Sequence, residues 1–244
     1  MRTLLYILYQ PYKWLVFVPF LVISTLFWGT VAVVIATTLS PRLASTTCGV
    51  WWSRLNSLLT PMFVSVRGRE HIDKKQSYVI VSNHQSHYDV FVLYGWLGID
   101  FKWVMKKELR KLPALGIACE KVGHIYIDRS NPETAIASLA KAKKRIVNGT
   151  SVLFFPEGTR SISGKLGEFK KGAFVMALDL GIPILPITIL DTRKILPPRT
   201  ANLFPGRARM VIHKPIDVSG YGKEQIAELI TLARQAIQAG LDSE

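Results

Sequence analysis

The longest uncharged segment of the chain constrains its fold most. Residues 14–41 run WLVFVPFLVISTLFWGTVAVVIATTLSP without an acidic or basic side chain, between Lys13 and Arg42. About 20 apolar residues are enough to cross the hydrocarbon core of a bilayer. The run is longer than the apolar region of a cleavable signal peptide, and no cleavage pattern of small residues stands out after it. The sequence therefore predicts a retained membrane anchor, and a buried core helix is the alternative.

A second apolar helix is predicted at residues 44–60, directly after the first run. One side of it carries or adjoins the large apolar side chains Trp51, Trp52, Leu55, Leu58 and Leu59. Tryptophan favours the interface between lipid head groups and acyl chains. Two arrangements fit: a spanning helix followed by an interfacial one, or a helical hairpin embedded in one leaflet. Basic residues flank the first run on both sides, so the positive-inside rule does not orient it.

Charge and cysteine content narrow the class of protein only partly. The 244 residues carry a net charge of +14, and the first 69 contain six Lys or Arg and no Asp or Glu. Such a field attracts anionic lipids, nucleic acid and phosphorylated substrates alike. Cys48 and Cys119 stand far apart, which excludes a zinc knuckle or a disulfide framework and favours a reducing, cytosol-facing body.

Beyond residue 62 the pattern changes to short β-branched or aromatic runs separated by helical stretches, which is typical of an α/β domain. We expect an anchoring segment at residues 1–61 and a folded domain at residues 62–244. Strands are predicted at residues 63–67, 77–82, 102–105, 124–127, 151–155, 184–190 and 208–213. Helices are predicted at residues 132–148, 170–180 and 222–239.

A His–Asp pair follows the strand at 77–82, at the strand-to-helix turn where α/β proteins place active sites. His84 and Asp89 are five residues apart, which would separate them by about 140° on a continuous helix. If His84 lies in the turn and Asp89 in the first helical turn, the carboxylate accepts a hydrogen bond from one imidazole nitrogen. The other nitrogen is then free to act as a base near neutral pH. Helix capping by Asn83 and His84, or a metal site with His87, are the alternatives.

Residues 155–160 (FPEGTR) follow the strongest apolar strand. Pro156 ends that strand, and Gly158 lets backbone amides approach a ligand closely. The Thr159 hydroxyl, exposed amides and the Arg160 guanidinium then converge on one loop, as a phosphate group requires. An ordinary turn with an ion pair between Glu157 and Arg160 is the alternative.

Two further segments contribute to the pattern. Residues 123–129 form a strand that delivers Asp128 and Arg129 to the same side of the domain, where Arg129 can clamp a phosphate unless Asp128 neutralises it. Residues 182–187 contain two prolines, and their apolar surface either lines a channel for a lipid chain or packs in the core. No Gly-x-Ser-x-Gly motif is present and neither cysteine is near a candidate base, which favours direct attack by a bound hydroxyl.

Together these four segments resemble the glycerolipid acyltransferase family, most closely its 1-acyl-sn-glycerol-3-phosphate acyltransferases. The family motif N-H-x4-D matches Asn83, His84 and Asp89, and F-P-E-G-T-R matches residues 155–160 without a substitution. The Asp-Arg strand matches residues 123–129, and the apolar proline-containing strand matches residues 182–187. The resemblance covers about residues 60–215.

The resemblance implies a mixed, mostly parallel sheet flanked by helices in the domain at residues 62–244, which would then be catalytic. It implies that His84 is the general base and Asp89 its partner. The acceptor-binding set would be Arg129, Glu157, Gly158, Thr159, Arg160, Lys106 and Lys107. Oxyanion stabilisation is expected from backbone amides near the His84 turn. No metal or redox cofactor is expected.

The implied reaction moves a fatty acyl group from acyl-CoA or acyl carrier protein to the sn-2 hydroxyl of lysophosphatidate, making phosphatidic acid. It would occur at a membrane, on the cytoplasmic face of the inner membrane if the chain is bacterial. Another lysophospholipid or a glycerol phosphate as acceptor, or hydrolysis of a lipid ester, are alternative activities. A basic membrane-surface or nucleic-acid-binding protein without catalysis is disfavoured, since aromatic and basic residues do not interleave in a nucleic-acid motif.

Overall fold

A mixed β-sheet forms the centre of the chain. The computed structural model describes residues 7, 9–146 and 148–243, and over these residues the sheet has seven strands. They are β1 (Met62–Arg67), β2 (Val79–Ser82), β3 (Phe101–Lys106), β4 (Ile125–Ile127), β5 (Ser151–Phe154), β6 (Ile184–Leu190) and β7 (Gly206–Ile212). Their order is β1-β7-β6-β2-β5-β3-β4. All neighbours pair in parallel except β6 with β7, so the predicted mostly parallel sheet is confirmed.

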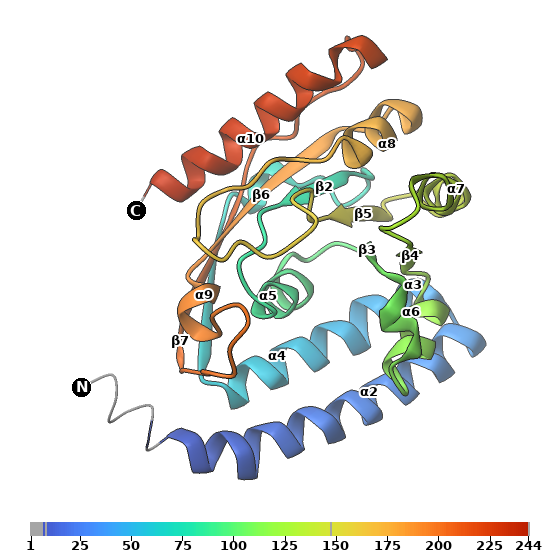
Figure 1. Cartoon of the computed structure of the whole chain (residues 1–244). Coiled ribbons are helices and arrows are strands. Elements are labelled where there is room, and N and C mark those ends of the chain that lie inside the picture. The colour runs from blue at the N-terminus through green and yellow to red at the C-terminus, as the bar shows by residue number, and fades with distance from the viewer. Residues whose placement is uncertain (1–6, 8, 147, 244) are drawn as a thin grey trace.

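Helices cover both faces of the sheet (Figure 1). The helices on one face are α4 (Val50–Leu59) and α5 (Tyr88–Trp96), and on the other α8 (Gly172–Leu180) and α10 (Ile226–Asp242). Outside α4 lies α2 (Val18–Thr38), which also packs against α6 (Leu115–Val122). The remaining helices are α3 (Pro41–Ala44), α7 (Pro132–Ala142), which packs on β4, and α9 (Thr192–Ile195).

Strand β2 supplies side chains to both halves of the core. Successive side chains of a strand point to opposite faces. Ile80 therefore packs on the α5 side, in the cluster that contains Phe101, whereas Val79 and Val81 pack on the side of α8 and α10. All three are completely buried, as expected for a parallel strand that is covered on both faces.

The predicted element boundaries agree with the structure best where the sequence is continuously apolar. Strand β6 spans the predicted residues 184–190. The helix predicted at 132–148 is shorter, because α7 ends at Ala142 and a 3-10 turn, Lys143–Arg145, follows it. The helix predicted at 44–60 begins as a π-helical turn, Ser45–Gly49, and continues as α4. Helix α6 was not predicted from the sequence.

The N-terminal helix exposes most of its apolar surface. Tyr9–Thr38 is helical over 30 residues, has a mean hydropathy of 2.2, and is the one helix in the described part of the chain that is long and apolar enough to cross a membrane. Only 11% of its most apolar window is buried, so the alternative of a core helix is wrong. The exposed side chains include Leu15, Val22, Ile23, Leu26, Phe27 and Val34. By length and composition this helix is suited to membrane association.

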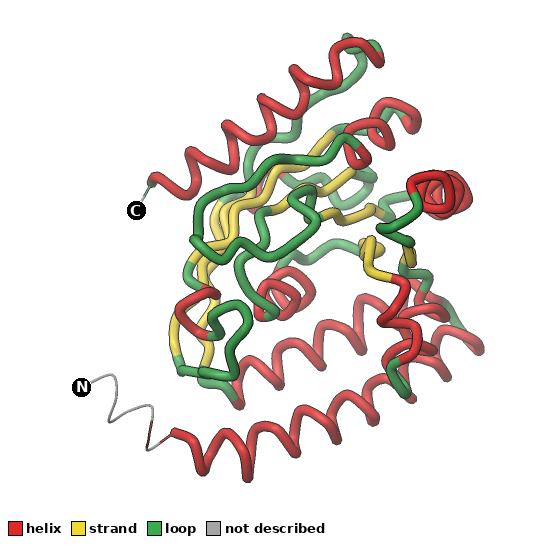
Figure 2. Tube along the Cα trace, viewed as in Figure 1, coloured by secondary structure: helices red, strands yellow, loops and turns green. Residues whose placement is uncertain are grey.

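Helix α2 is fastened along its length to the rest of the molecule. Figure 2 shows α2 and α4 as neighbouring helices below the sheet. Between them, Ser24 and Asn56 exchange hydrogen bonds, and the Trp52 indole N–H donates to the Thr25 hydroxyl at 3.0 Å. The expectation of an interfacial position is therefore wrong for Trp52, which faces inward, whereas Trp51 is 53% exposed.

Both ends of this helical segment also bond to the domain that follows it. Near its start, the Lys13 ammonium donates to the Ala201 carbonyl at 2.9 Å. Beyond its end, the Arg42 guanidinium donates to the Asn148 carbonyl at 2.8 Å. The helix therefore lies along the domain instead of projecting away from it.

Candidate active site

Four segments that carry candidate site residues meet at one edge of the sheet. The strands β2, β5, β3 and β4 are adjacent and parallel, so their carboxyl ends share an edge. His84 follows β2, residues 155–160 follow β5, Lys106 ends β3 and Arg129 follows β4. The carboxyl edge of a parallel sheet is where α/β proteins bind ligands. The sheet order thus brings together segments that are up to 76 residues apart in the sequence.

The predicted His–Asp pair is formed. His84 lies in the turn after β2, and Asp89 lies in the first turn of α5. The Nδ1 atom of His84 is 2.7 Å from Oδ2 of Asp89. The Asp89 side chain is completely buried, whereas the His84 side chain is 16% exposed. An ionised carboxylate only accepts hydrogen bonds, so Nδ1 carries the proton and Nε2 presents a lone pair. In the described part of the chain, Nε2 makes no hydrogen bond.

Four hydrogen-bond donors compensate for the burial of the Asp89 carboxylate. Besides His84, its Oδ2 atom accepts the backbone N–H groups of Gln85 at 2.6 Å and Ser86 at 2.9 Å. Its Oδ1 atom accepts the Thr192 hydroxyl at 2.5 Å. A buried carboxylate needs such donors to remain ionised. Thr192 was not a candidate from the sequence, because it lies 103 residues from Asp89 and belongs to no motif.

Glu157 joins the two motif-bearing turns. Its Oε1 atom accepts the backbone N–H of His84, and its Oε2 atom accepts that of Gly167, both at 2.9 Å. Burial raises the pKa of Glu157, and the two N–H donors oppose that shift. Both carboxylate oxygens thus hold backbone in place. Acceptor binding by Glu157 stays a prediction, and the contacts observed are those of a positioning residue.

The His84 ring is also fixed from its flat side. It stacks on Phe155 with 3.8 Å between ring centroids and 8° between the planes. The backbone N–H of Ser161 donates to the His84 carbonyl at 2.8 Å. Asn83 exchanges two hydrogen bonds with the backbone of Ile189 in β6, so the turn is anchored to the sheet. These contacts hold the imidazole in one orientation.

His84 faces a cavity of about 980 Å³ that is mainly apolar. Its walls come from α2, α4, α5, β3 and α6, together with the loop that follows α9. Apolar lining residues include Phe17, Leu21, Trp52, Phe91, Met105 and Val122. The membrane-suited helix and the His–Asp pair therefore border the same space. The sequence did not predict this contribution of α2.

The predicted cationic residues divide into two groups. Arg129, Arg160 and Lys106 line the cavity with His84, as do Gly158 and Thr159. The Arg129 guanidinium donates to the Gly158 carbonyl, so the loops after β4 and β5 are joined. Gly158 has φ +74°, a conformation that favours glycine. Lys107, by contrast, lies outside the cavity lining and pairs with Asp128 at 2.5 Å.

The contacts also bear on the expected oxyanion donors and on the apolar proline-containing strand. The amides of His84, Gln85 and Ser86 are occupied by Glu157 and Asp89, so these three are not free to stabilise an oxyanion. The strand at 184–190 is buried throughout, and residues 182–187 are absent from the cavity lining, so they pack in the core. Within the described ranges, no group of three or more His, Cys, Asp or Glu is placed to hold a metal ion.

Comparisons with known proteins agree with the motifs. Residues 63–190 match the acyltransferase family. A 1-acyl-sn-glycerol-3-phosphate acyltransferase of Pseudomonas aeruginosa is 34% identical over 225 residues, covering 90% of this chain and 86% of the relative. A chloroplastic enzyme of the same name from Brassica napus is 39% identical over 62% of this chain, which spans 44% of that relative's length. The chain thus spans less than half of this plant relative.

A solved structure shares the whole fold. The 1-acyl-sn-glycerophosphate acyltransferase of Thermotoga maritima has a TM-score of 0.83, with 25% identity and coverage of 100% of this chain and 99% of the other. The site thus combines an oriented imidazole with a mainly apolar cavity that cationic side chains also line. The chain belongs to the acyltransferase family.

Proposed function

We propose that this protein transfers a fatty acyl group from an acyl thioester to the sn-2 hydroxyl of 1-acyl-sn-glycerol-3-phosphate, making phosphatidic acid. The observation that carries the proposal is the His84–Asp89 pair, at 2.7 Å, whose histidine lines a mainly apolar cavity together with Arg129, Arg160 and Lys106. The names of the bacterial and plant relatives support the same reaction.

The hydroxyl is activated by His84. Its Nε2 atom removes the proton of the sn-2 hydroxyl while the oxygen attacks the carbonyl carbon of the thioester. Asp89 stabilises the imidazolium that forms. When the tetrahedral intermediate collapses, the carbon–sulfur bond breaks and the imidazolium returns its proton to the departing thiolate. The reaction needs no covalent acyl-enzyme, no metal and no redox cofactor.

The acceptor phosphate binds to the cations of the cavity. Arg160 and Arg129 provide planar guanidinium groups suited to a phosphate, and Lys106 is a further cation in the cavity lining. The apolar remainder of the cavity takes an acyl chain, because burial of each methylene stabilises binding by about 0.8 kcal/mol. Both coenzyme A and acyl carrier protein fit this chemistry as the donor's carrier.

The protein lies on one leaflet of a membrane and does not cross it. Lys13 and Arg42 bond to the domain at opposite ends of the apolar helix, so the domain occupies one side of that helix along its whole length. The exposed apolar side chains of α2 are then free to enter the leaflet. The lysolipid enters the site from this leaflet, and the cytoplasmic face stays a prediction.

The decisive experiment compares His84→Ala with His71→Ala in purified protein. His71 lies outside the cavity and bonds to the Ile212 carbonyl. With labelled acyl donor and lysophosphatidate, we expect His84→Ala to lower the rate of phosphatidate formation by about 10²- to 10⁴-fold. His71→Ala should retain the wild-type rate, and circular dichroism should show both variants folded.

The same assay separates the rival activities. Label released as free fatty acid by the wild type, without phosphatidate, would identify a lipid hydrolase. A panel of lysolipids and glycerol phosphate, each offered with acyl-CoA and with acyl carrier protein, assigns the acceptor and the carrier. Near-wild-type turnover in His84→Ala would contradict the proposed base.

A further inference from the structure

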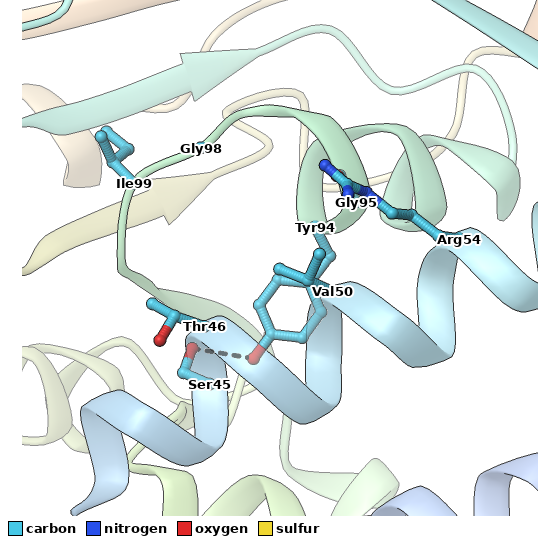
Figure 3. Close-up of a pocket in the computed structure, with 8 residues that line it drawn as sticks. All are labelled: Ser45, Thr46, Val50, Arg54, Tyr94, Gly95, Gly98 and Ile99. Carbon is cyan, nitrogen blue, oxygen red and sulfur yellow. Dashed lines mark hydrogen bonds between the residues drawn. The ribbon is translucent and has the colours of Figure 1, made fainter.

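Several arginines in this protein hold backbone carbonyl groups in place. Arg54 is one example, because its guanidinium donates to the Gly95 carbonyl near the end of α5 at 2.9 Å. Figure 3 shows these two residues side by side, on the wall of a small second cavity. An arginine used in this way joins its own element to the backbone of another. Where that backbone belongs to the active site, the bond couples a distant element to the reaction.

The segment between β5 and α8 is a long loop with active-site residues near its start. Residues 155–171, all of which the structure describes, form no helix or strand. Loops of this length are uncommon in compact domains and are usually functional. Gly158, Thr159 and Arg160 of this loop line the cavity with His84. Contacts with other elements must hold such a loop in one conformation.

Three guanidinium groups from three other elements donate to backbone carbonyls of this loop. The bonds are Arg129 to Gly158, Arg193 to Ile162, and Arg234 to Leu166 and Gly167. Arg129 is already part of the cavity lining, and Arg193 belongs to α9. Arg234 belongs to α10, 67 residues beyond Gly167 and outside residues 60–215, which carry the resemblance to the family. The sequence motifs therefore give no reason to assign it a role.

Arg234 bonds to a peptide group that Glu157 also holds. The carbonyl of Leu166 and the N–H of Gly167 belong to one planar peptide group, in which they point in opposite directions. Nη2 of Arg234 donates to that carbonyl at 3.2 Å, and the N–H donates to Oε2 of Glu157 at 2.9 Å. A positive charge at the carbonyl polarises the peptide group and strengthens donation by its N–H. The same peptide group is therefore fixed from both sides.

Glu157 extends this contact to the proposed base. Its other oxygen, Oε1, accepts the backbone N–H of His84 at 2.9 Å. A continuous chain of hydrogen bonds thus runs from Arg234 through the peptide group and Glu157 to the turn after β2. A Cβ atom added at Gly167 would lie 3.0 Å from Oε2 of Glu157, which is tighter than a usual contact. Glycine at this position allows the close approach of the carboxylate.

Helix α10 is a firm support for this chain. It packs on β6 and α8, and its Leu229, Ala233 and Ile237 side chains are completely buried. Arg234 is partly buried and is absent from the cavity lining, so it does not contact the substrate that the cavity would hold. Any effect of Arg234 on the reaction must pass through the backbone that it bonds.

We propose that Arg234 is a positioning residue, which holds the His84 turn through the peptide group of Leu166 and Gly167 and through Glu157. This inference rests on the proposed function, in which His84 removes the proton of the acceptor hydroxyl. A displacement of about 1 Å at a reacting group lowers an enzymatic rate by about 100-fold. Loosening of this chain therefore lowers kcat. Binding of the acceptor phosphate by Arg160 and Arg129 is left in place.

The experiment compares Arg234→Met with Gln235→Met in purified protein, with acyl-CoA as donor and lysophosphatidate as acceptor. Methionine keeps an apolar stem and removes the guanidinium donors, and Gln235 is the exposed neighbour on the same helix. Arg234→Met should lower kcat by about 5- to 20-fold and change KM for lysophosphatidate by less than about twofold. Gln235→Met should keep both constants.

A double variant tests the route of the effect. Glu157→Gln already interrupts the chain, so the addition of Arg234→Met should lower kcat by no more than about twofold further. If the two residues acted independently, their effects on kcat would multiply. Arg234→Lys keeps the charge and one donor group, so its kcat should lie between those of the wild type and Arg234→Met. It replaces Arg234→Met if that variant does not fold.

Hydrogen exchange follows the same chain without the reaction. The amide hydrogens of His84 and Gly167 should exchange about fivefold faster in Arg234→Met than in the wild type or in Gln235→Met. Unchanged kcat in Arg234→Met, a raised KM with unchanged kcat, or multiplied effects in the double variant would each overturn the inference. An inactive wild type with the expected exchange pattern would contradict the proposed function, and the hydrogen-bond chain would still stand.

Discussion

At the residue scale, every polar side-chain atom of the buried residues Asp89 and His124 has a hydrogen-bond partner. Asp89 has four donors for its two oxygens, and His124 has one donor and one acceptor for its two ring nitrogens. In an apolar interior an unmatched polar atom is destabilising by about 1–3 kcal/mol. The matching therefore fixes protonation states as well as positions: Asp89 is ionised and His124 is neutral.

The neutral state of His124 makes stability depend on pH. Burial, with a contribution from Lys102, lowers the pKa of His124 to about 3. The unfolded chain binds this proton below about pH 6.5 but the folded chain does not, so stability falls as the pH falls below that value, by about 1.4 kcal/mol per unit. Between pH 6.5 and 5, wild-type protein should lose about 2 kcal/mol more unfolding free energy than His124→Gln.

Urea unfolding in detergent at these two pH values measures the difference. His213→Gln is the matched control. His213 bonds to Thr188, and burial lowers its pKa too, but His213 is only partly buried, whereas His124 is buried. His213→Gln should therefore change the pH dependence of the unfolding free energy less than His124→Gln does. If the unfolding free energy depends on pH equally in the wild type and in His124→Gln, then His124 is protonated in the folded protein.

At the element scale, the site depends on how the turns after β2 and β5 are joined. Glu157 bonds to His84 in one turn and to Gly167 beyond the other. A glutamine at this position would direct an NH2 group at one of these N–H donors and leave it unpaired. A buried N–H group that is left without an acceptor destabilises the arrangement of the two turns by about 1–3 kcal/mol. We expect Glu157→Gln to lower kcat by about 10- to 100-fold with little change in KM for lysophosphatidate.

Steady-state kinetics distinguish this positioning role from acceptor binding. Glu168→Gln is the control, because Glu168 is exposed and lies in the same loop. If Glu157 bound the acceptor, as the sequence resemblance implies, the substitution would raise KM instead. A raised KM for lysophosphatidate with unchanged kcat would therefore support acceptor binding by Glu157 and contradict the positioning role.

The sequence predicted individual strands and motif residues better than it predicted which elements lie next to each other in the fold. Continuous apolar runs identified β2 and β6, and the N-H-x4-D spacing identified His84 and Asp89. The antiparallel pairing of β6 with β7 has no local signal. The bond from Thr192 to Asp89 and the cavity wall that α2 provides both join segments that are far apart in the sequence. Local hydrophobic periodicity therefore does not predict them. Trp52 fits an interfacial pattern, and only the packing of α2 on α4 turns it inward.

At the scale of the whole molecule, one apolar surface and one catalytic cavity share a helix. The outer side of α2 carries Ile23, 65% exposed, and Phe27, 58% exposed. Its inner side lines the cavity with residues such as Leu21 and Trp28. Under the proposed function, a lysolipid that leaves the leaflet along α2 would reach the site without passing through water. The proposal thus gives the apolar helix a role in substrate entry as well as in attachment.

Attachment through α2 predicts a selective loss of membrane binding. Ile23→Lys with Phe27→Lys places two charges on the surface proposed to enter the leaflet, where burial of a charge is strongly unfavourable. We expect the double variant to shift from the vesicle fraction to the soluble fraction in flotation assays. Its turnover should fall on lysophosphatidate in vesicles by tenfold or more, and much less on a short-chain, water-soluble lysophosphatidate, since the site itself is intact.

The control for this variant is Ile136→Lys, which makes the same chemical change at a 67% exposed position on α7, away from α2 (Figure 1). It should float with vesicles as the wild type does. The salt dependence of flotation is a second measure. In the double variant α2 no longer inserts, so only the attraction of the +14 chain to anionic lipid remains. Salt screens this attraction over about 8 Å at physiological ionic strength. Flotation of the double variant that survives high salt would mean that the leaflet is entered by another surface.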